Sequence, residues 1–111
     1  MNDLWLDWSH YQVPDHTKRA FEDYILHGYP PGSFMSAVLS NNFIGAACQA
    51  GHVNREHLTD IAKWVINVAP SMCWGNERAI KDWLSDKDGV RTQFYEHHEK
   101  KRMWEILQEQ A

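Results

Sequence analysis

The chain has 111 residues, of which 43% are hydrophobic and 23% are charged, and its formal net charge at pH 7 is −4. This length suits one domain that buries a modest core. The acidic excess argues against a protein that holds DNA or RNA through a basic surface. Because the sequence has neither a signal-peptide pattern nor about 18 uninterrupted apolar residues, we expect a cytoplasmic protein without a membrane partner.

Residues 1–16 are predicted to form an aromatic N-terminal arm. Trp5, Trp8 and Tyr11 recur at the three-residue spacing of one helical face, among aspartates, and Pro14 closes the segment. Two interpretations are open. The arm either covers the core with its tryptophans or presents them to a partner as a docking segment.

Residues 17–89 are predicted to form a helical core, divided by residues that favour the ends of helices. Ser, Thr and Asn favour N-caps, Gly and Asn tolerate the left-handed conformation that ends a helix, and Pro cannot continue one. The candidate N-caps are Thr17, Ser33, Asn54 and Asn76, and the candidate stops are Gly28, Asn41 and Pro70. They predict helices over about 17–27, 33–40, 42–50, 55–69 and 79–84, followed by a turn at 86–89.

An uncharged block lies within this core, since the chain has no Lys, Arg, Asp or Glu between Tyr24 and Asn54. We expect the block to be the packed centre of the fold, with Phe34, Phe43 and Ala46 among its buried residues. The clearest helical periodicity follows the block, where apolar residues recur at three- and four-residue intervals. This stripe consists of Leu58, Ile61, Ala62, Val65 and Val68.

Residues 90–111 are predicted to form a charged amphipathic C-terminal helix. Its apolar residues make a broad, interrupted stripe and are Phe94, Tyr95, Met103, Trp104, Ile106 and Leu107. The middle of the stripe is occupied by His97, His98 and Lys101. Such a helix either packs only at its two ends or projects and meets another chain, and homodimerisation through it is one expectation.

These patterns together predict an all-α protein. No segment shows the alternation of apolar and polar residues that is typical of a half-buried strand. The caps and stops divide the chain into five or six helices, and its length places them in one compact domain. We find no internal repeat and no low-complexity tract that would indicate a different organisation.

Candidate chemistry is sparse. His97 and His98 are adjacent and point about 100 degrees apart on a helix, so they do not form a simple metal-binding pair, and we expect no cofactor, no metal site and no catalytic residue. Cys48 and Cys73 both lie in apolar neighbourhoods, which is typical of free, buried thiols. A small hydrolase that uses Cys73 or a serine beside a histidine is a third alternative.

Part of the uncharged block is familiar. His27, Gly28, Pro30, Pro31, Gly32 and Phe34, then the run AVLSN at 37–41 and the run CWG at 73–75, follow a common pattern. With it, residues 19–84 resemble a group of short proteins encoded by tailed bacteriophages and prophages. The group has no established activity. The resemblance therefore implies a phage setting, in which small proteins commonly act by occupying a site on a host or defence protein.

The expected function is that of a non-enzymatic protein-binding module, a phage-related modulator or inhibitor of a host or defence protein. Exposed aromatic side chains are suitable anchors for such contacts, and Tyr29 lies in a Pro-rich segment that could form a recognition loop. The candidate partner-binding residues are Trp5, Trp8, Tyr11, Tyr29, Phe94, Tyr95 and Trp104. The partner is expected to be a host or phage protein, and a small helical DNA-binding regulator is the alternative.

Overall fold

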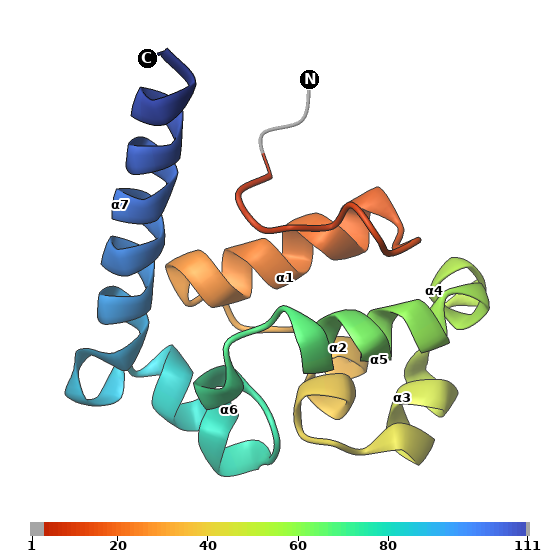
Figure 1. Ribbon diagram of the computed structural model, residues 1–111. Helices are drawn as coiled ribbons and strands as arrows, with labels where there is room; N and C mark the ends of the chain where they lie inside the picture. Colours follow the sequence, from red (N-terminus) through yellow and green to blue (C-terminus); the bar gives the residue numbers. More distant parts are fainter. Residues whose placement is uncertain (1–3, 111) are drawn as a thin grey trace.

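A computed structural model describes residues 4–110, in which every regular element is helical (Figure 1). The predicted all-α class is confirmed, with seven α-helices in this range rather than five or six. The α-helices are α1 (Asp15–His27), α2 (Ser33–Leu39), α3 (Phe43–Gln49), α4 (His52–Glu56), α5 (Leu58–Asn67), α6 (Glu77–Leu84) and α7 (Val90–Gln110). Two 3-10 turns are η1 (Ser71–Cys73) and η2 (Lys87–Gly89). Residues 1–3 of the predicted arm and residue 111 of the predicted last helix lie outside the described residues.

Helix α1 is the centre of the core. Phe21, Tyr24 and Ile25 on this helix are completely buried. The Tyr24 hydroxyl donates a hydrogen bond to the carbonyl of Cys73 (2.8 Å), and the indole N–H of Trp83 is shared between the carbonyls of Tyr24 and Ile25, each 3.2 Å away. Large aromatic rings thus fill the core while their polar atoms are satisfied by backbone at helix ends.

Three of the predicted helix ends are confirmed. Gly28 ends α1 in the left-handed conformation with φ 69°, and Asn41, two residues after the end of α2, has φ 64°. Asn76 caps α6, because its side-chain oxygen accepts a hydrogen bond from the N–H of Ala79 (2.8 Å). Gly and Asn tolerate the left-handed backbone of Gly28 and Asn41, and Asn76 supplies a side-chain acceptor at the start of a helix, which is why the sequence reveals these positions.

Three predicted N-caps are wrong. Helix α1 starts two residues before Thr17, whose buried hydroxyl instead donates to the side-chain oxygen of Asn54 (2.5 Å). Asn54 lies inside α4 and does not cap α5. Ser33 is already helical, and its hydroxyl donates to the side chain of Gln49 (3.2 Å). In each case a tertiary hydrogen bond or an earlier helix start replaces the local cap.

The predicted helix over 55–69 is interrupted at His57, where φ is −115° and α4 gives way to α5. Ile61 and Val65 of its apolar stripe are buried as expected. Phe43 was expected to be buried and is 66% exposed, which corrects that prediction, whereas Ala46 on the same helix is buried. The first turn of α3 lies at the edge of an opening toward α5, so Phe43 borders this opening instead of filling the core.

Candidate protein-binding surfaces

The N-terminal arm is fixed to α1 by the carboxylate of Glu22. One of its oxygens accepts a hydrogen bond from the backbone N–H of Trp5 (2.8 Å), and the other accepts from the N–H of Leu6 (3.0 Å) and from the indole N–H of Trp8 (2.8 Å). Glu22 itself is only 6% exposed. A buried carboxylate that satisfies three donors from one segment holds that segment in a single position.

Trp8 is a core residue, which corrects its assignment to partner binding. Its ring stacks on that of Trp64 with 3.7 Å between ring centroids and 5° between ring planes, and Phe21 lies beside both rings. The indole N–H of Trp64 donates to the carbonyl of Asp7 (2.8 Å). Since Trp8 is 6% exposed, its ring offers no free face to a partner. Trp8 therefore fits the interpretation in which the arm covers the core with its tryptophans.

Trp5 joins the arm to α7. Its ring stacks on Tyr95 with 5.3 Å between centroids, and the guanidinium of Arg102 lies over it at 4.7 Å. The Nε2 atom of His98 is 2.8 Å from the carbonyl oxygen of Trp5. Phe94 lies between the rings of His98 and Trp83. The structure therefore brings together three of the predicted partner-binding residues, Trp5, Phe94 and Tyr95, where they hold α7 against the body.

Tyr11 and Tyr29 occupy different environments. Tyr11 packs partly buried against the core, and its N–H donates to the carbonyl of Trp8 (3.1 Å). Tyr29 follows the left-handed Gly28 and is exposed, with the ring of His27 5.9 Å away between centroids. Of the four candidate partner-binding residues before α2, Tyr29 is thus the most exposed.

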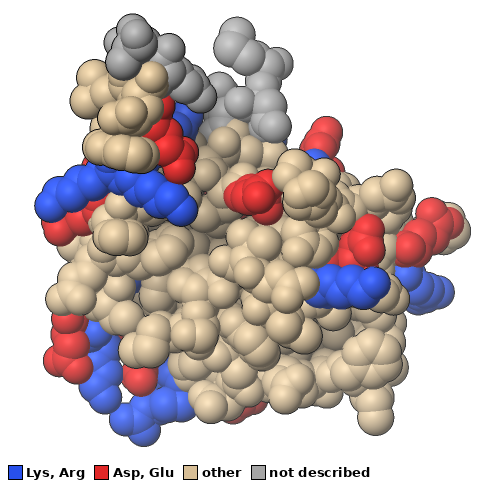
Figure 2. All heavy atoms as spheres, viewed as in Figure 1, with Lys and Arg blue, Asp and Glu red and all other residues tan. Residues whose placement is uncertain are grey.

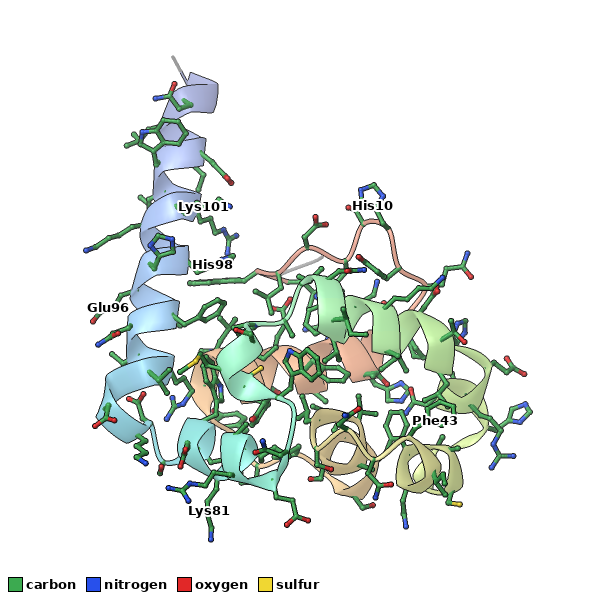
Figure 3. The ribbon with its side chains drawn as sticks, turned by 60° about the horizontal axis from the view of Figure 1, so that its bottom comes forward. His10, Phe43, Lys81, Glu96, His98 and Lys101 are labelled. Atoms are coloured by element: carbon green, nitrogen blue, oxygen red, sulfur yellow. The ribbon has the colours of Figure 1, made fainter. Side chains whose placement is uncertain are left out.

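The last turns of α7 carry an exposed apolar surface that we call the helix tip, defined as Met103, Trp104, Ile106 and Leu107. Trp104 and Leu107 are 61% and 59% exposed. Because a helix turns by about 100 degrees per residue, Trp104 and Leu107 lie on the opposite side from the residues that hold α7 to the body. Figures 1 and 3 both show these turns extending beyond the other helices. Trp104 and Leu107, the two most exposed side chains of the helix tip, therefore face away from the domain.

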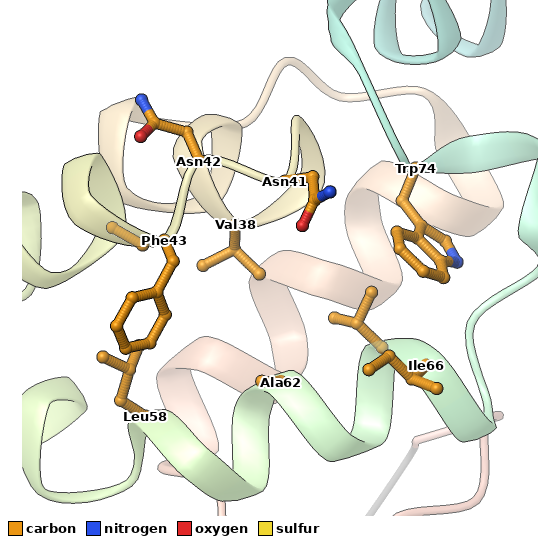
Figure 4. Close-up of a pocket in the computed structure, with 10 residues that line it drawn as sticks. Val38, Asn41, Asn42, Phe43, Leu58, Ala62, Ile66 and Trp74 are labelled. Atoms are coloured by element: carbon orange, nitrogen blue, oxygen red, sulfur yellow. The ribbon is translucent and has the colours of Figure 1, made fainter.

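A second apolar surface is a groove between the α2–α3 connection and α5, with a cavity of about 90 Å³ (Figure 4). None of its lining residues is charged, and they are Val38, Asn41, Asn42, Phe43, Ala46, Leu58, Ala62, Val65, Ile66 and Trp74. We call this set the apolar groove. Phe43 and Ile66 are both about two-thirds exposed at its edges. In Figure 2 the lower middle of the view is mostly free of Lys, Arg, Asp and Glu, whereas blue and red side chains lie nearer the centre and along the edges.

Trp74 closes one end of the apolar groove. Its Nε1 atom is buried and has no hydrogen-bond partner among the described residues. Figure 4 shows this nitrogen on the side of the ring that is turned away from the cavity. The groove therefore meets the carbon edge of the indole, which keeps this end of the surface apolar.

Sequence reasoning missed the groove and placed only Trp104 of the helix tip among the binding residues. The position of Ile66 could have indicated an exposed apolar surface, because this residue lies outside the stripe that packs α5 against the core. Nothing in the sequence indicated that Phe43 is exposed, since a large apolar residue in an uncharged block is typical of a core position. Which side of α3 opens to solvent depends on where α5 lies, and that is a tertiary property.

The cysteine nucleophile of the hydrolase alternative is buried. Cys73 is completely inaccessible, and burial raises the pKa of its thiol to about 12. Cys48 is exposed on α3, which corrects the expectation that both cysteines are buried. No group of three or more His, Cys, Asp or Glu side chains within the described part of the chain is placed to hold a metal ion.

A thiol reagent at pH 8 is expected to modify one cysteine of the native protein and two of the denatured protein. The elevated pKa keeps the Cys73 thiol protonated at this pH, and only the thiolate is a good nucleophile, so Cys48 reacts alone. A titration with and without denaturant, repeated on Cys48→Ser, counts the reactive groups. Rapid modification of native Cys48→Ser would contradict the buried placement of Cys73 and revive the hydrolase alternative.

Comparisons with protein-family models, with curated proteins and with solved structures found no match to this chain. Among the described residues, no helix is both long enough and apolar enough to cross a membrane.

Proposed function

We propose that the protein is a non-enzymatic protein-binding module that modulates or inhibits a host or defence protein in a phage setting. The observation that carries this proposal is the helix tip, whose apolar side chains are exposed on the end of α7 that projects beyond the other helices in Figure 1. Contiguous exposed apolar residues in a small domain commonly mark a surface that is covered by another molecule. The phage setting is supported by the resemblance of residues 19–84.

The composition of the helix tip favours a protein as the partner. Tryptophan is among the side chains that dominate binding energy at protein interfaces, and Trp104 stands beside Met103 and Leu107 on one side of a regular helix. An amphipathic helix of this kind inserts its apolar side chains into a groove of its partner. We therefore expect the partner to present an apolar groove to α7.

The proposal is tested by affinity capture of the tagged, full-length protein from bacterial lysate, with and without nuclease treatment. We expect one stoichiometric protein to be retained by the wild type and lost when Trp104→Ala and Leu107→Ser are combined. The matched control is Met72→Ser, which removes another exposed apolar side chain from η1 and should leave capture unchanged.

Two results would overturn this proposal. Retention that does not depend on Trp104 and Leu107 would remove the helix tip from partner binding. If the retained material consists of nucleic-acid-binding proteins that disappear with nuclease, the alternative of a DNA-binding regulator takes its place.

A further inference from the structure

We infer that the apolar groove is a binding site for a small, neutral aromatic molecule that carries one hydrogen-bonding group, such as a phenol. The inference goes beyond the proposed function, because it assigns a ligand to a surface that does not include the helix tip. It rests on the size of the cavity, on the chemistry of its lining and on the way in which its walls are held.

The cavity in the apolar groove has the size of one small ring. Its volume is about 90 Å³, whereas sites for drug-sized ligands have about 300 Å³ or more. An apolar cavity of about 150 Å³ inside a protein stays dry and binds benzene. The cavity in this protein is smaller but lies in a groove, so a single ring can enter it and leave a substituent at the opening.

The lining favours a neutral ligand with a flat apolar body. No lining residue is charged, so an ionised ligand would lose water without meeting a countercharge. Ala62 and Val65 of α5 contribute to one wall, and Figure 4 shows Val38 on the wall that faces Ala62. Phe43 and Trp74 add aromatic surface at the edges, where contact with another ring is worth more than the buried area alone.

One polar group is available in this apolar surrounding, the side-chain amide of Asn41. Figure 4 shows it directed toward the space between Val38 and Ile66. Nothing else in the described part of the fold forms a hydrogen bond with this amide, whereas the side chain of Asn42 accepts from the N–H of Gly45 (2.9 Å). A hydroxyl on the ligand can therefore donate to the amide oxygen of Asn41 or accept from its N–H₂ group.

Backbone hydrogen bonds hold the walls of the groove in place. The N–H of Gly75 donates to the carbonyl of Leu39 (2.6 Å), which joins the end of α2 to the segment that carries Trp74. Asn41 has the left-handed φ of 64°, and its N–H donates to the carbonyl of Val38 (3.1 Å). A site that is formed before the ligand arrives costs little ordering entropy on binding. Even a ligand of one ring can then bind measurably.

The first test titrates the full-length protein with phenol and with benzene, and follows the backbone amide signals by two-dimensional NMR. We expect both compounds to bind in the millimolar range and to shift the signals of Asn41, Ile66 and Trp74, while those of the helix tip stay unchanged. Benzoate carries a negative charge on the same ring and is expected to bind more weakly than phenol, since no cation lines the groove.

The second test uses variants that separate the ring from its polar group. Ala62→Leu fills the cavity and is expected to abolish binding of both compounds, and Ala62→Val takes its place if the leucine variant does not fold. Asn41→Gly keeps a residue that tolerates the left-handed backbone but removes the amide, so it should weaken phenol about threefold or more and leave benzene unchanged. Val53→Leu enlarges an exposed side chain outside the groove and is the control.

Three results would overturn the inference. The first is the absence of shifts at Asn41, Ile66 and Trp74 at the highest soluble concentrations of phenol and benzene. The second is binding that persists in folded Ala62→Leu or Ala62→Val. The third is tighter binding of N-acetyltyrosine amide than of phenol, which would assign the groove to a tyrosine side chain of a peptide instead of a free small molecule.

Discussion

Replacing Glu22 by alanine is expected to lower the free energy of unfolding by about 3 kcal/mol or more. The carboxylate accepts three hydrogen bonds from the arm, two from backbone N–H groups and one from the indole of Trp8. Hydrogen bonds to a charged group are among the stronger ones in proteins, and their donors stay buried when the acceptor is removed. The arm would lose its attachment to α1, and Leu6 and Trp8 would be drawn out of the core with it.

Urea denaturation followed by tryptophan fluorescence measures this effect. The matched control is Asp23→Ala, which removes the neighbouring carboxylate from the exposed side of α1 and should change stability by less than about 0.5 kcal/mol. Glu22→Gln is expected to fall between the two, because it keeps one acceptor oxygen but turns an N–H₂ group toward the donors. Equal stabilities of Glu22→Ala and Asp23→Ala would show that the arm does not depend on Glu22.

Trp64→Ala is expected to cost about 3–5 kcal/mol and to leave little folded protein under ordinary conditions. Trp64 is completely buried, its ring is covered by those of Trp8 and Phe21, and its indole N–H satisfies the carbonyl of Asp7. The substitution opens a large cavity where the arm, α1 and α5 meet, and it removes one of the hydrogen bonds that fix the arm.

The comparison with Trp104→Ala separates the structural tryptophan from the exposed one. Trp104 lies in the helix tip, so its removal should change the unfolding free energy by less than about 0.5 kcal/mol while weakening association. Thermal melts followed by circular dichroism report both variants on the same scale. If Trp104→Ala destabilised the protein as strongly as Trp64→Ala, the helix tip would have to be packed rather than exposed.

The sequence predicted the helical class and several helix ends because these depend on local chemistry. Gly28 ends a helix through its own backbone conformation, and Asn76 starts one through its own side chain. Both properties follow from the residue type alone. The uncharged block was a poorer guide to the core. It supplies Ile25 and Leu39, but the largest buried side chains, Trp64 and Trp83, come from charged regions outside it.

The binding surfaces were harder to predict, since exposure is decided by neighbours that are distant in the sequence. Trp8 and Trp104 are the same residue type in similarly polar surroundings, yet Trp64 covers the first and nothing in the described chain covers the second. Spacing predicted an aromatic segment with one helical face, but residues 4–14 form no helix. It could not show that Glu22, an acidic residue inside a helix, turns inward to hold that segment.

The contact between Trp5 and His98 joins residues that are 93 positions apart. During synthesis it can form only after nearly the whole chain has left the ribosome. Trp8 and Glu22 can meet early, because both emerge from the ribosome long before the last helix does. Trp5 has no stacking partner until Tyr95 and Arg102 have also emerged. The packing of Trp5 against α7 is therefore the latest of these steps. In a nascent chain that stalls before α7 is complete, Trp8 would be bound to Glu22 while the ring of Trp5 would still lack its contacts with Tyr95 and Arg102.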